Sequence, residues 1–581
     1  MFGVMWALAI IICSLVNSAA SPQAATPFAE ACWTGEPGLP TIPPPSPANA
    51  RTLVEAMGWA TAAAKKVMES PAIRGRMWPK LITLSTAFSG VGTGELAMRA
   101  LAQAFAKLGL AIEVRDVFAV EKSVSCQEEL LSVLHPEAII DGGPCIFGDI
   151  MQLLPRKVLK TLRVSIASTQ PEALRKLVMT SRLNRELWCV ARGRKCLLRH
   201  SDYHLAGTPC VEASRMGTKS RGWALLVFYT WAAMILLLLP MLVIHENVPE
   251  FGTADLEQAL GSAYVIVARV LLCPSDLGWA IRRPRQFCLL ARRTLVKIPR
   301  ALTQDYVDRL AVWLLYRKRS YGWTEHFWME SSDPELLLEE AWALGRKAVK
   351  HRRAMIASGV DAHCDDMLSW ASLLTPRERE RVEHYKFILP GEVADLHQEA
   401  DQKAIVSKNG ELGTVVKSVG LMWSGIMGRW LARKELLAAM GFPITLEHVT
   451  ANSGVASSFS IGCTPPVTRS HHSQGEACGN AFHMNAIGGT MLLALVIFPE
   501  LGGGRLTSGG LLPSATSSST SHACSKTSEP PEPPSRGLKR ASPTSHVCST
   551  SSSACQTRPD GGGNNRLLRM LMRRDSEQKP P

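Results

Sequence analysis

Two acidic residues close strand-like apolar runs in this sequence, and both are candidates for chemistry. Glu121 ends the segment "IEVRDVFAVE", and Glu246 follows the apolar "MLVI" of residues 241–244. Burying a carboxylate is costly unless it is partnered or protonated. A carboxyl group at such a position is therefore a candidate acid or binding group. The alternative is that each strand has already reached solvent and the side chain is an ordinary surface glutamate.

A glycine-rich turn precedes the first of these acids. Residues 81–106 combine a strand-type apolar run, a turn containing Gly90, Gly92 and Gly94, and an amphipathic helix. Glycines let the backbone approach a ligand closely, and a helix N-terminus favours negative charge. In nucleotide-binding α/β folds, a carboxylate at the tip of the second strand accepts hydrogen bonds from ribose hydroxyls, and Glu121 is expected at that position. A tight turn without a ligand would use the same glycines.

A series of motifs, met in order along the chain, resembles the cytosine-5 nucleic-acid methyltransferase family in a divergent, eukaryotic or protist-like form. The motifs are "FSGVGTGE" at 88–95, "VEKS" at 120–123, "FGDI" at 147–150, "AGTPCVEASRMG" at 206–217, "HENV" at 245–248, "GWAIRRPRQF" at 278–287, "GRWLARKELLAAMGFP" at 428–443 and "GNAFHMNAIGGTMLLAL" at 479–495. Any one string could arise by chance, whereas their shared order is discriminating.

The resemblance implies S-adenosylmethionine as the cofactor. The glycine turn packs around it, the acids at 121 and 149 meet its ribose and its adenine, and the last motif returns to it. The cofactor-binding residues implied are Phe88, Gly90, Gly92, Glu121, Asp149 and Asn480. Thr86 stands where many members have Asp, so the hydrogen bonding of the turn is expected to differ.

The resemblance also implies the reacting groups. Cys210 is the nucleophile that adds to carbon 6 of cytosine, and Glu246 is the acid that activates ring nitrogen 3. Arg283 and Arg285 contact the carbonyl oxygen of the base and brace the site. Cys145, in a competing "GGPC", is rejected because "FGDI" follows it immediately.

Three positions depart from the family pattern at the reactive motifs. Val211 replaces the usual Gln after the nucleophile, and Ala280 and Ile281 replace Pro and Gln. The departures keep a second interpretation open, in which the chain is a catalytically silent relative that binds nucleic acid without turnover. A third candidate is an RNA cytosine-5 methyltransferase, since the chemistry is the same.

The expected fold is α/β: a Rossmann-like S-adenosylmethionine-dependent methyltransferase domain with a mainly parallel sheet, plus a smaller helical target-recognition domain. At 581 residues the chain exceeds what one core usually serves. The predicted division is a signal-like or targeting segment at 1–21, a Pro-rich linker at 22–79, the catalytic domain at 80–290 with a probable insertion at 151–203, a target-recognition region at 291–470, a helix returning to the catalytic domain at 471–500, and a disordered tail at 501–581.

An apolar stretch from Ala224 to Ile244 is long enough to span a bilayer, but Pro240 divides it. We predict a buried helix to about Leu239 followed by a buried strand. Stable membrane insertion of the catalytic domain is therefore not expected, although the apolar N-terminus keeps a membrane-anchored or secreted protein as a rival hypothesis.

The formal charge of +14 suggests a polyanionic partner. DNA is the expected partner, with RNA possible, and a nucleus or DNA-containing organelle is the expected location. The fifteen cysteines contain no CxxC pair, so no metal site is predicted. The oligomeric state is left open.

Overall fold

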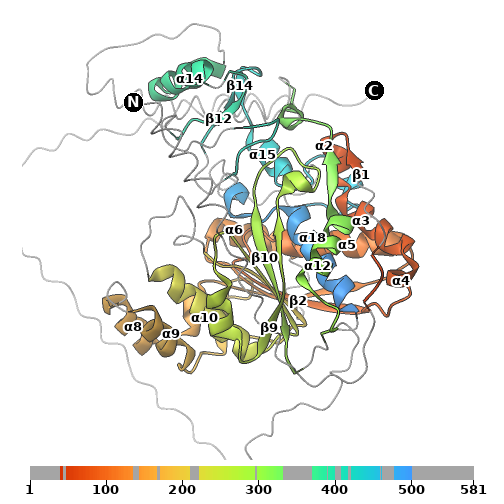
Figure 1. Cartoon of the computed structure of the whole chain (residues 1–581). Coiled ribbons are helices and arrows are strands. Elements are labelled where there is room, and N and C mark those ends of the chain that lie inside the picture. The colour runs from red at the N-terminus through yellow and green to blue at the C-terminus, as the bar shows by residue number, and fades with distance from the viewer. Residues whose placement is uncertain are drawn as a thin grey trace, which may run out of the picture. The chain divides into compact units, whose positions relative to one another are not determined.

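The computed structural model is organised around one large twisted sheet covered by helices (Figure 1). The residues that it describes are 39–42, 48–134, 143–165, 170–209, 222–294, 298–330, 370–388, 390–398, 407–415, 420–457, 460 and 477–499.

The large sheet has nine strands in the order β6-β5-β4-β3-β2-β7-β8-β10-β9. The five central strands, from β4 to β8, run parallel, whereas β10 is antiparallel to both of its neighbours and the β5–β6 hairpin extends the other edge. The strands are β2 (Leu81–Ala87), β3 (Glu113–Val120), β4 (Cys145–Phe147), β5 (Glu186–Cys189), β6 (Arg194–Leu197), β7 (Tyr203–Gly207), β8 (Leu242–Asn247), β9 (Tyr264–Leu272) and β10 (Arg285–Arg292).

This strand order, with helices on both faces, is a Rossmann-like α/β fold with a mainly parallel sheet, as predicted. From β2 the chain builds outward through β3 and β4, then returns to place β7 on the other side of β2. In open α/β sheets, ligands bind outside the carboxyl ends of the strands at such a reversal. A ligand site is therefore expected at the carboxyl ends of β2, β3, β7 and β8.

Apolar helices cover the sheet because nearly continuous apolar runs need burial on all sides. One face carries α5 (Thr93–Lys107), α12 (Gln304–Leu315) and α18 (Met484–Ile497), which share a core with β2 and β9. The opposite face carries α10 (Trp223–Leu238) and α11 (Thr253–Leu260), and α6 (Val124–Val133) connects β3 to β4. Figure 1 shows α5, α12 and α18 together beside the sheet, with α10 on the other side.

The apolar stretch that includes Pro240 forms a helix and a strand, which confirms the prediction. Helix α10 ends where Leu239 adopts a left-handed conformation with φ of 50°, and β8 begins at Leu242. Within the described residues, the segment Ala477–Ile497 is long and apolar enough to cross a membrane, but 94% of it is buried inside the protein. It is a core helix here, because its side chains already have protein neighbours.

The prediction of a linker through residue 79 is wrong for its second half. Residues 53–74 form α2 (Leu53–Met57), α3 (Trp59–Glu69) and α4 (Pro71–Arg74), and α3 packs against α5 and α18. Trp59 fills the space above Gly488, where an added Cβ would lie 2.1 Å from the indole ring. The sequence signal for these helices is the alanine-rich amphipathic pattern that follows the prolines at 43–45.

The predicted insertion at 151–203 contributes both helix and strand. It contains α8 (Arg156–Ser165), α9 (Pro171–Met179) and the β5–β6 hairpin, after a short turn η1 (Ile150–Leu153). The hairpin was not predicted. Strand β5 alternates exposed and buried residues, which is typical of a strand with one face on a core.

The region from 291 to 470 is divided differently from the prediction. Its first part packs with the main core and contains α12, β11 (Arg317–Arg319) and η3 (Trp323–His326). Strand β11 pairs with β1 (Ala48–Ala50). The short helix η2 (Pro274–Asp276) comes earlier in the chain, before β10. Residues 370–430 form a separate small core with η4 (Trp370–Leu373), α14 (Pro376–Ile388) and a sheet of β12 (Val393–Asp395), β13 (Met422–Ser424) and β14 (Arg429–Trp430). Residues 331–369 of the predicted target-recognition region lie outside the described residues.

A buried ion pair joins the small core to the helix that follows it, α15 (Arg433–Ala439), which is itself followed by α16 (Leu446–Ala451). Arg429 donates to both carboxylate oxygens of Glu435 at 2.7 and 2.8 Å. Glu435 also accepts the backbone amides of Ala432 and Met329. The ion pair thus gives Arg429 and Glu435 of the motif at 428–443 a structural role.

Candidate active site at the carboxyl ends of the parallel strands

The glycine turn after β2 has the strained backbone that a close approach requires. Gly90 and Gly92 have φ of 55° and 82°, and Phe88 also has a positive φ of 56°, which is unfavourable for a residue with a side chain. A Cβ on Gly90 would lie 2.7 Å from the backbone oxygen of Asn480. The turn and the last motif, predicted to share one ligand, are therefore in direct contact.

Thr86, which stands where the resemblance predicts an Asp, is hydrogen-bonded to a carboxyl group of α5. The hydroxyl of Thr86 donates to Glu95 Oε1 at 2.6 Å and lies 2.5 Å from the hydroxyl of Ser89. Burial raises the pKa of Glu95 to about 7, and the neighbouring charge of Asp116 adds to the increase. The acid thus supports the turn from α5. Glu95 is visible in the sequence as the last residue of "FSGVGTGE", but the sequence does not show that its side chain turns toward Thr86.

Glu121, at the end of β3, links the turn to the next strand connection. Its Oε2 accepts the Gly90 amide at 2.8 Å, and its Oε1 accepts the Ser123 amide at 2.8 Å. Asp149 follows β4, where Oδ1 accepts the Met151 amide at 3.0 Å and Oδ2 pairs with Lys122 at 3.1 Å. The two acids predicted for ribose and adenine thus lie at the ends of adjacent strands.

Glu246 lies at the carboxyl end of β8 and is nearly buried. Its Oε1 pairs with Arg285 Nε at 3.0 Å, and 12% of its side chain is exposed. Burial raises the pKa of Glu246, although Arg285 and Arg283 act in the opposite direction. Such a carboxyl group keeps its proton to higher pH than a surface glutamate, which is the property needed in a general acid.

The two arginines of the motif at 278–287 have different environments. Arg285 lies opposite the acid because β10 runs antiparallel to β8 and pairs Phe287 with Glu246. Arg283 instead donates to the backbone oxygens of Val415 and of Ala481, the latter at 3.1 Å. Arg283 therefore braces segments from three parts of the chain, and the arginine beside the acid is Arg285.

Cys210 lies outside the described residues, but the chain that leads to it is well defined. Gly207, the last residue of β7, pairs in register with Glu246. The side-chain amide of Asn247 donates to the backbone oxygen of Thr208 at 3.2 Å and to the Thr208 hydroxyl at 3.1 Å. That hydroxyl lies 2.7 Å from His245 Nε2. The residues that lead to the predicted nucleophile are thus held beside the predicted acid.

Sequence reasoning missed Gly207 as a residue required by the site. A Cβ there would lie 2.6 Å from the ring of Phe482 and 3.0 Å from Glu246 Oε2. The signal was the glycine that closes an apolar strand immediately before "TPC". Glycine at this point leaves space for the acid.

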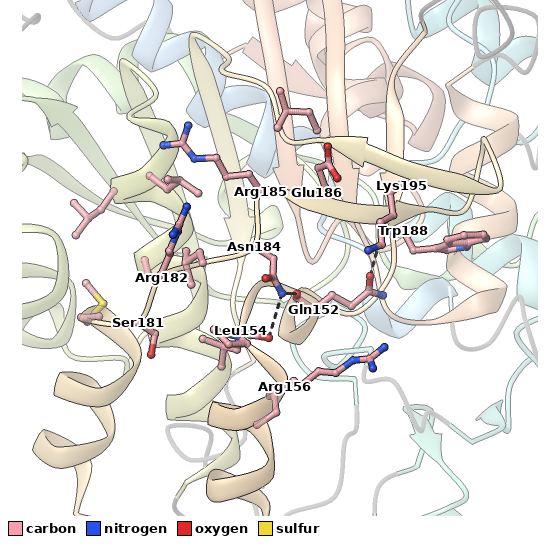
Figure 2. A pocket seen from close by; sticks show the side chains of 18 residues that line it. Gln152, Leu154, Arg156, Ser181, Arg182, Asn184, Arg185, Glu186, Trp188 and Lys195 are labelled. Atoms are coloured by element: carbon pink, nitrogen blue, oxygen red, sulfur yellow. Dashed lines mark hydrogen bonds between the residues drawn. The ribbon is translucent and has the colours of Figure 1, made fainter. Parts of the chain in front are cut away.

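A separate groove lies among elements of the insertion. It has a volume of about 1430 Å³ and is bounded by α8, α9, the hairpin and α10. Figure 2 shows Arg156, Arg182, Arg185 and Lys195 around it, together with Trp188. None of the predicted site residues lines this groove.

Neither a protein-family model nor a curated protein matches the sequence. Solved structures similar to this one include the Dnmt2 methyltransferase of S. pombe, with 12% identity, a TM-score of 0.35, and coverage of 71% of this chain and 98% of that one. A putative DNA modification methyltransferase encoded within an E. coli prophage has 12% identity, a TM-score of 0.35, and coverage of 71% and 99%. The Entamoeba histolytica methyltransferase EhMeth has 10% identity, a TM-score of 0.35, and coverage of 72% and 98%.

Proposed function

We propose that this chain transfers a methyl group from S-adenosylmethionine to carbon 5 of cytosine in a nucleic acid, with DNA as the first substrate. The observation that carries the proposal is the pairing of Gly207 with Glu246 at the carboxyl ends of β7 and β8. Cys210 follows Gly207 by three residues. The strand end that precedes the predicted nucleophile in the sequence therefore lies next to a nearly buried carboxyl group.

The residues of the cofactor half fit the proposed donor. A glycine turn with positive φ, an acid at the end of β3 and another after β4 provide close backbone approach and hydrogen-bond acceptors. Phe88, Gly90, Gly92, Glu121, Asp149 and Asn480 would hold the cofactor. When bound, S-adenosylmethionine supplies an electrophilic methyl group.

The chain's own residues then perform the remaining steps. The Cys210 thiolate forms a bond to carbon 6 of the base, while Glu246 donates its proton to ring nitrogen 3, where negative charge would otherwise build. Carbon 5 becomes nucleophilic. After methylation, a solvent water accepts the carbon 5 proton, the bond between carbon 6 and sulfur breaks to release the Cys210 thiolate, and ring nitrogen 3 returns its proton to Glu246, which restores the aromatic ring. Because carbon 6 is inaccessible in a duplex, the base must be flipped out of the stack.

Tritium release from cytosine labelled at carbon 5 tests the proposal, with DNA and RNA as parallel substrates. Release by the full chain should require S-adenosylmethionine and vanish in Cys210→Ser. Cys273→Ser is the matched control, since Cys273 is a half-buried thiol in the connection between β9 and η2. Release from RNA alone would replace DNA as the substrate class.

Covalent capture distinguishes an enzyme from a silent binder. With 5-fluorocytosine in the oligonucleotide, fluorine cannot leave carbon 5 as a cation, so the Cys210 adduct should persist through denaturing electrophoresis. Binding of both nucleic acids without an adduct or tritium release would overturn the proposal and establish the catalytically silent alternative.

A further inference from the structure

Three cysteines that are far apart in the sequence meet at the edge of the large sheet. Cys145 is in β4, Cys189 in β5 and Cys196 in β6. Their sulfur atoms all lie within 4.8 Å of one another. The strand register explains the meeting: Phe147 pairs with Cys189, and Leu187 pairs with Cys196, so the three thiols are on one face of adjacent strands.

That face is the buried one. Cys145 and Cys189 are buried and Cys196 is half-buried, whereas Trp188 and Lys195 point to the other face, toward the groove. Figure 2 shows Trp188 and Lys195 at this groove. The cluster is thus separated from solvent on most sides, with access at Cys196.

From this geometry we propose that Cys145, Cys189 and Cys196 bind one Zn²⁺ ion, with a solvent water completing a tetrahedral site on the Cys196 side. Three thiolates suit a soft or borderline ion, and Zn²⁺ takes four ligands. Three thiolates and Zn²⁺ together carry one negative charge. The Arg192 guanidinium, in the turn between β5 and β6, supplies a positive charge near the cluster.

A thiolate is the form of cysteine that binds a metal, so the three thiols would release their protons to solvent when the ion binds.

The ion would have a structural role, because it joins three strands where their pairing is short. Strand β4 and strand β5 pair in register at Phe147 and Cys189, and the Val190 amide adds one hydrogen bond to Ile146 at 2.7 Å. A metal bound across β4, β5 and β6 would fasten the hairpin to the sheet. It would also fix the wall of the groove that carries Trp188 and Lys195.

Metal analysis of the full chain tests this proposal without reference to methyl transfer. Purified protein, loaded with Zn²⁺ and dialysed, should retain one ion per chain. Cys196→Ser and Cys189→Ser should lose it, whereas Cys273→Ser, the half-buried control, should retain it. Cd²⁺ as a probe should give thiolate charge-transfer absorption in the wild type that is lost in the same two variants.

A stability measurement adds an independent readout. Removal of the ion by a chelator should lower the melting temperature of the wild type and of Cys273→Ser, and leave Cys196→Ser unchanged. Absence of bound metal in the wild type would overturn the proposal, as would a Cys145–Cys189 disulfide found by non-reducing peptide mapping. Equal metal loss in Cys273→Ser and Cys196→Ser would also overturn it.

Discussion

At the scale of single residues, two carboxyl groups depart most clearly from ordinary glutamates, and both do so because they are buried. Glu246 has Arg285 as an ion-pair partner, whereas Glu95 accepts a hydrogen bond from the Thr86 hydroxyl. Burial penalises the charged form in each case. For Glu246 the consequence concerns the proposed catalysis, and for Glu95 it concerns the stability of the fold.

Glu246→Gln should lower the rate of tritium release by about 10²- to 10⁴-fold, the usual contribution of a general acid. The amide preserves the shape of the side chain but has no proton to give. Because burial raises the pKa of Glu246, the wild-type rate should fall as pH rises through that pKa. The nearby exposed Glu250→Gln should retain activity. A Glu246→Gln enzyme with an unchanged pH profile would remove Glu246 from its proposed role.

Glu95→Gln should make the protein more stable at pH 8 and remove part of its pH dependence. The pKa of Glu95 is raised to about 7 in the fold, so folding favours the protonated form. Stability should decline from about pH 4.5 to pH 7 and then level off, a loss of about 3 kcal/mol. Urea unfolding at pH 5 and pH 8 measures it. The exposed Glu69→Gln serves as the control, and an equal pH slope in all three proteins would contradict the assignment.

At the scale of elements, the site depends on parallel strands ending together. The register pairs Gly207 with Glu246, and the antiparallel β10 brings Arg285 to the same edge. Strands β7 and β8 end at this edge and β10 begins there. Because these strand ends are close together, there is no space for a side chain at Gly207.

Gly207→Ala should reduce stability by about 1–3 kcal/mol, the usual cost of overpacking, and should also reduce the catalytic rate. The added methyl group would lie 2.6 Å from the Phe482 ring and 3.0 Å from Glu246 Oε2. Gly252→Ala is the matched control, since a Cβ there meets nothing within 4 Å. Chemical unfolding and tritium release measure the two effects. Equal behaviour of the two variants would refute the packing argument.

At the scale of the whole molecule, segments that precede and follow the large sheet in the sequence pack into one core. The N-terminal α3 lies against α5 and α18, and α12 lies against β9. Arg283 connects the backbone at Val415 and Ala481. The region before residue 80 is therefore needed to bury the last helix.

Trp59→Ala should destabilise the protein by about 3–5 kcal/mol, because it removes a buried indole and leaves a cavity above Gly488. Trp223→Ala provides the control, since Trp223 is 51% exposed whereas Trp59 is 2% exposed. Thermal and urea unfolding of both variants would measure the difference. A cost for Trp59→Ala no larger than for Trp223→Ala would mean that α3 does not belong to the core.

The sequence by itself determined the local elements and the order of the motifs. The glycine turn, the acids at 121 and 246, and the helix and strand on either side of Pro240 follow from periodicity, composition and turn chemistry, which are properties of neighbouring residues. The resemblance then assigned roles in chain order. These features were predictable because each depends on a short segment.

Only the tertiary structure decided which distant residues meet. Arg285, rather than Arg283, forms the ion pair with Glu246. Glu95 is hydrogen-bonded to Thr86, where an Asp was expected. The thiols of β4, β5 and β6 lie close together. Strand order and register set these contacts, and one residue of register reverses the face of a side chain. No local pattern in the sequence carries that information, because it arises from the packing of the whole chain.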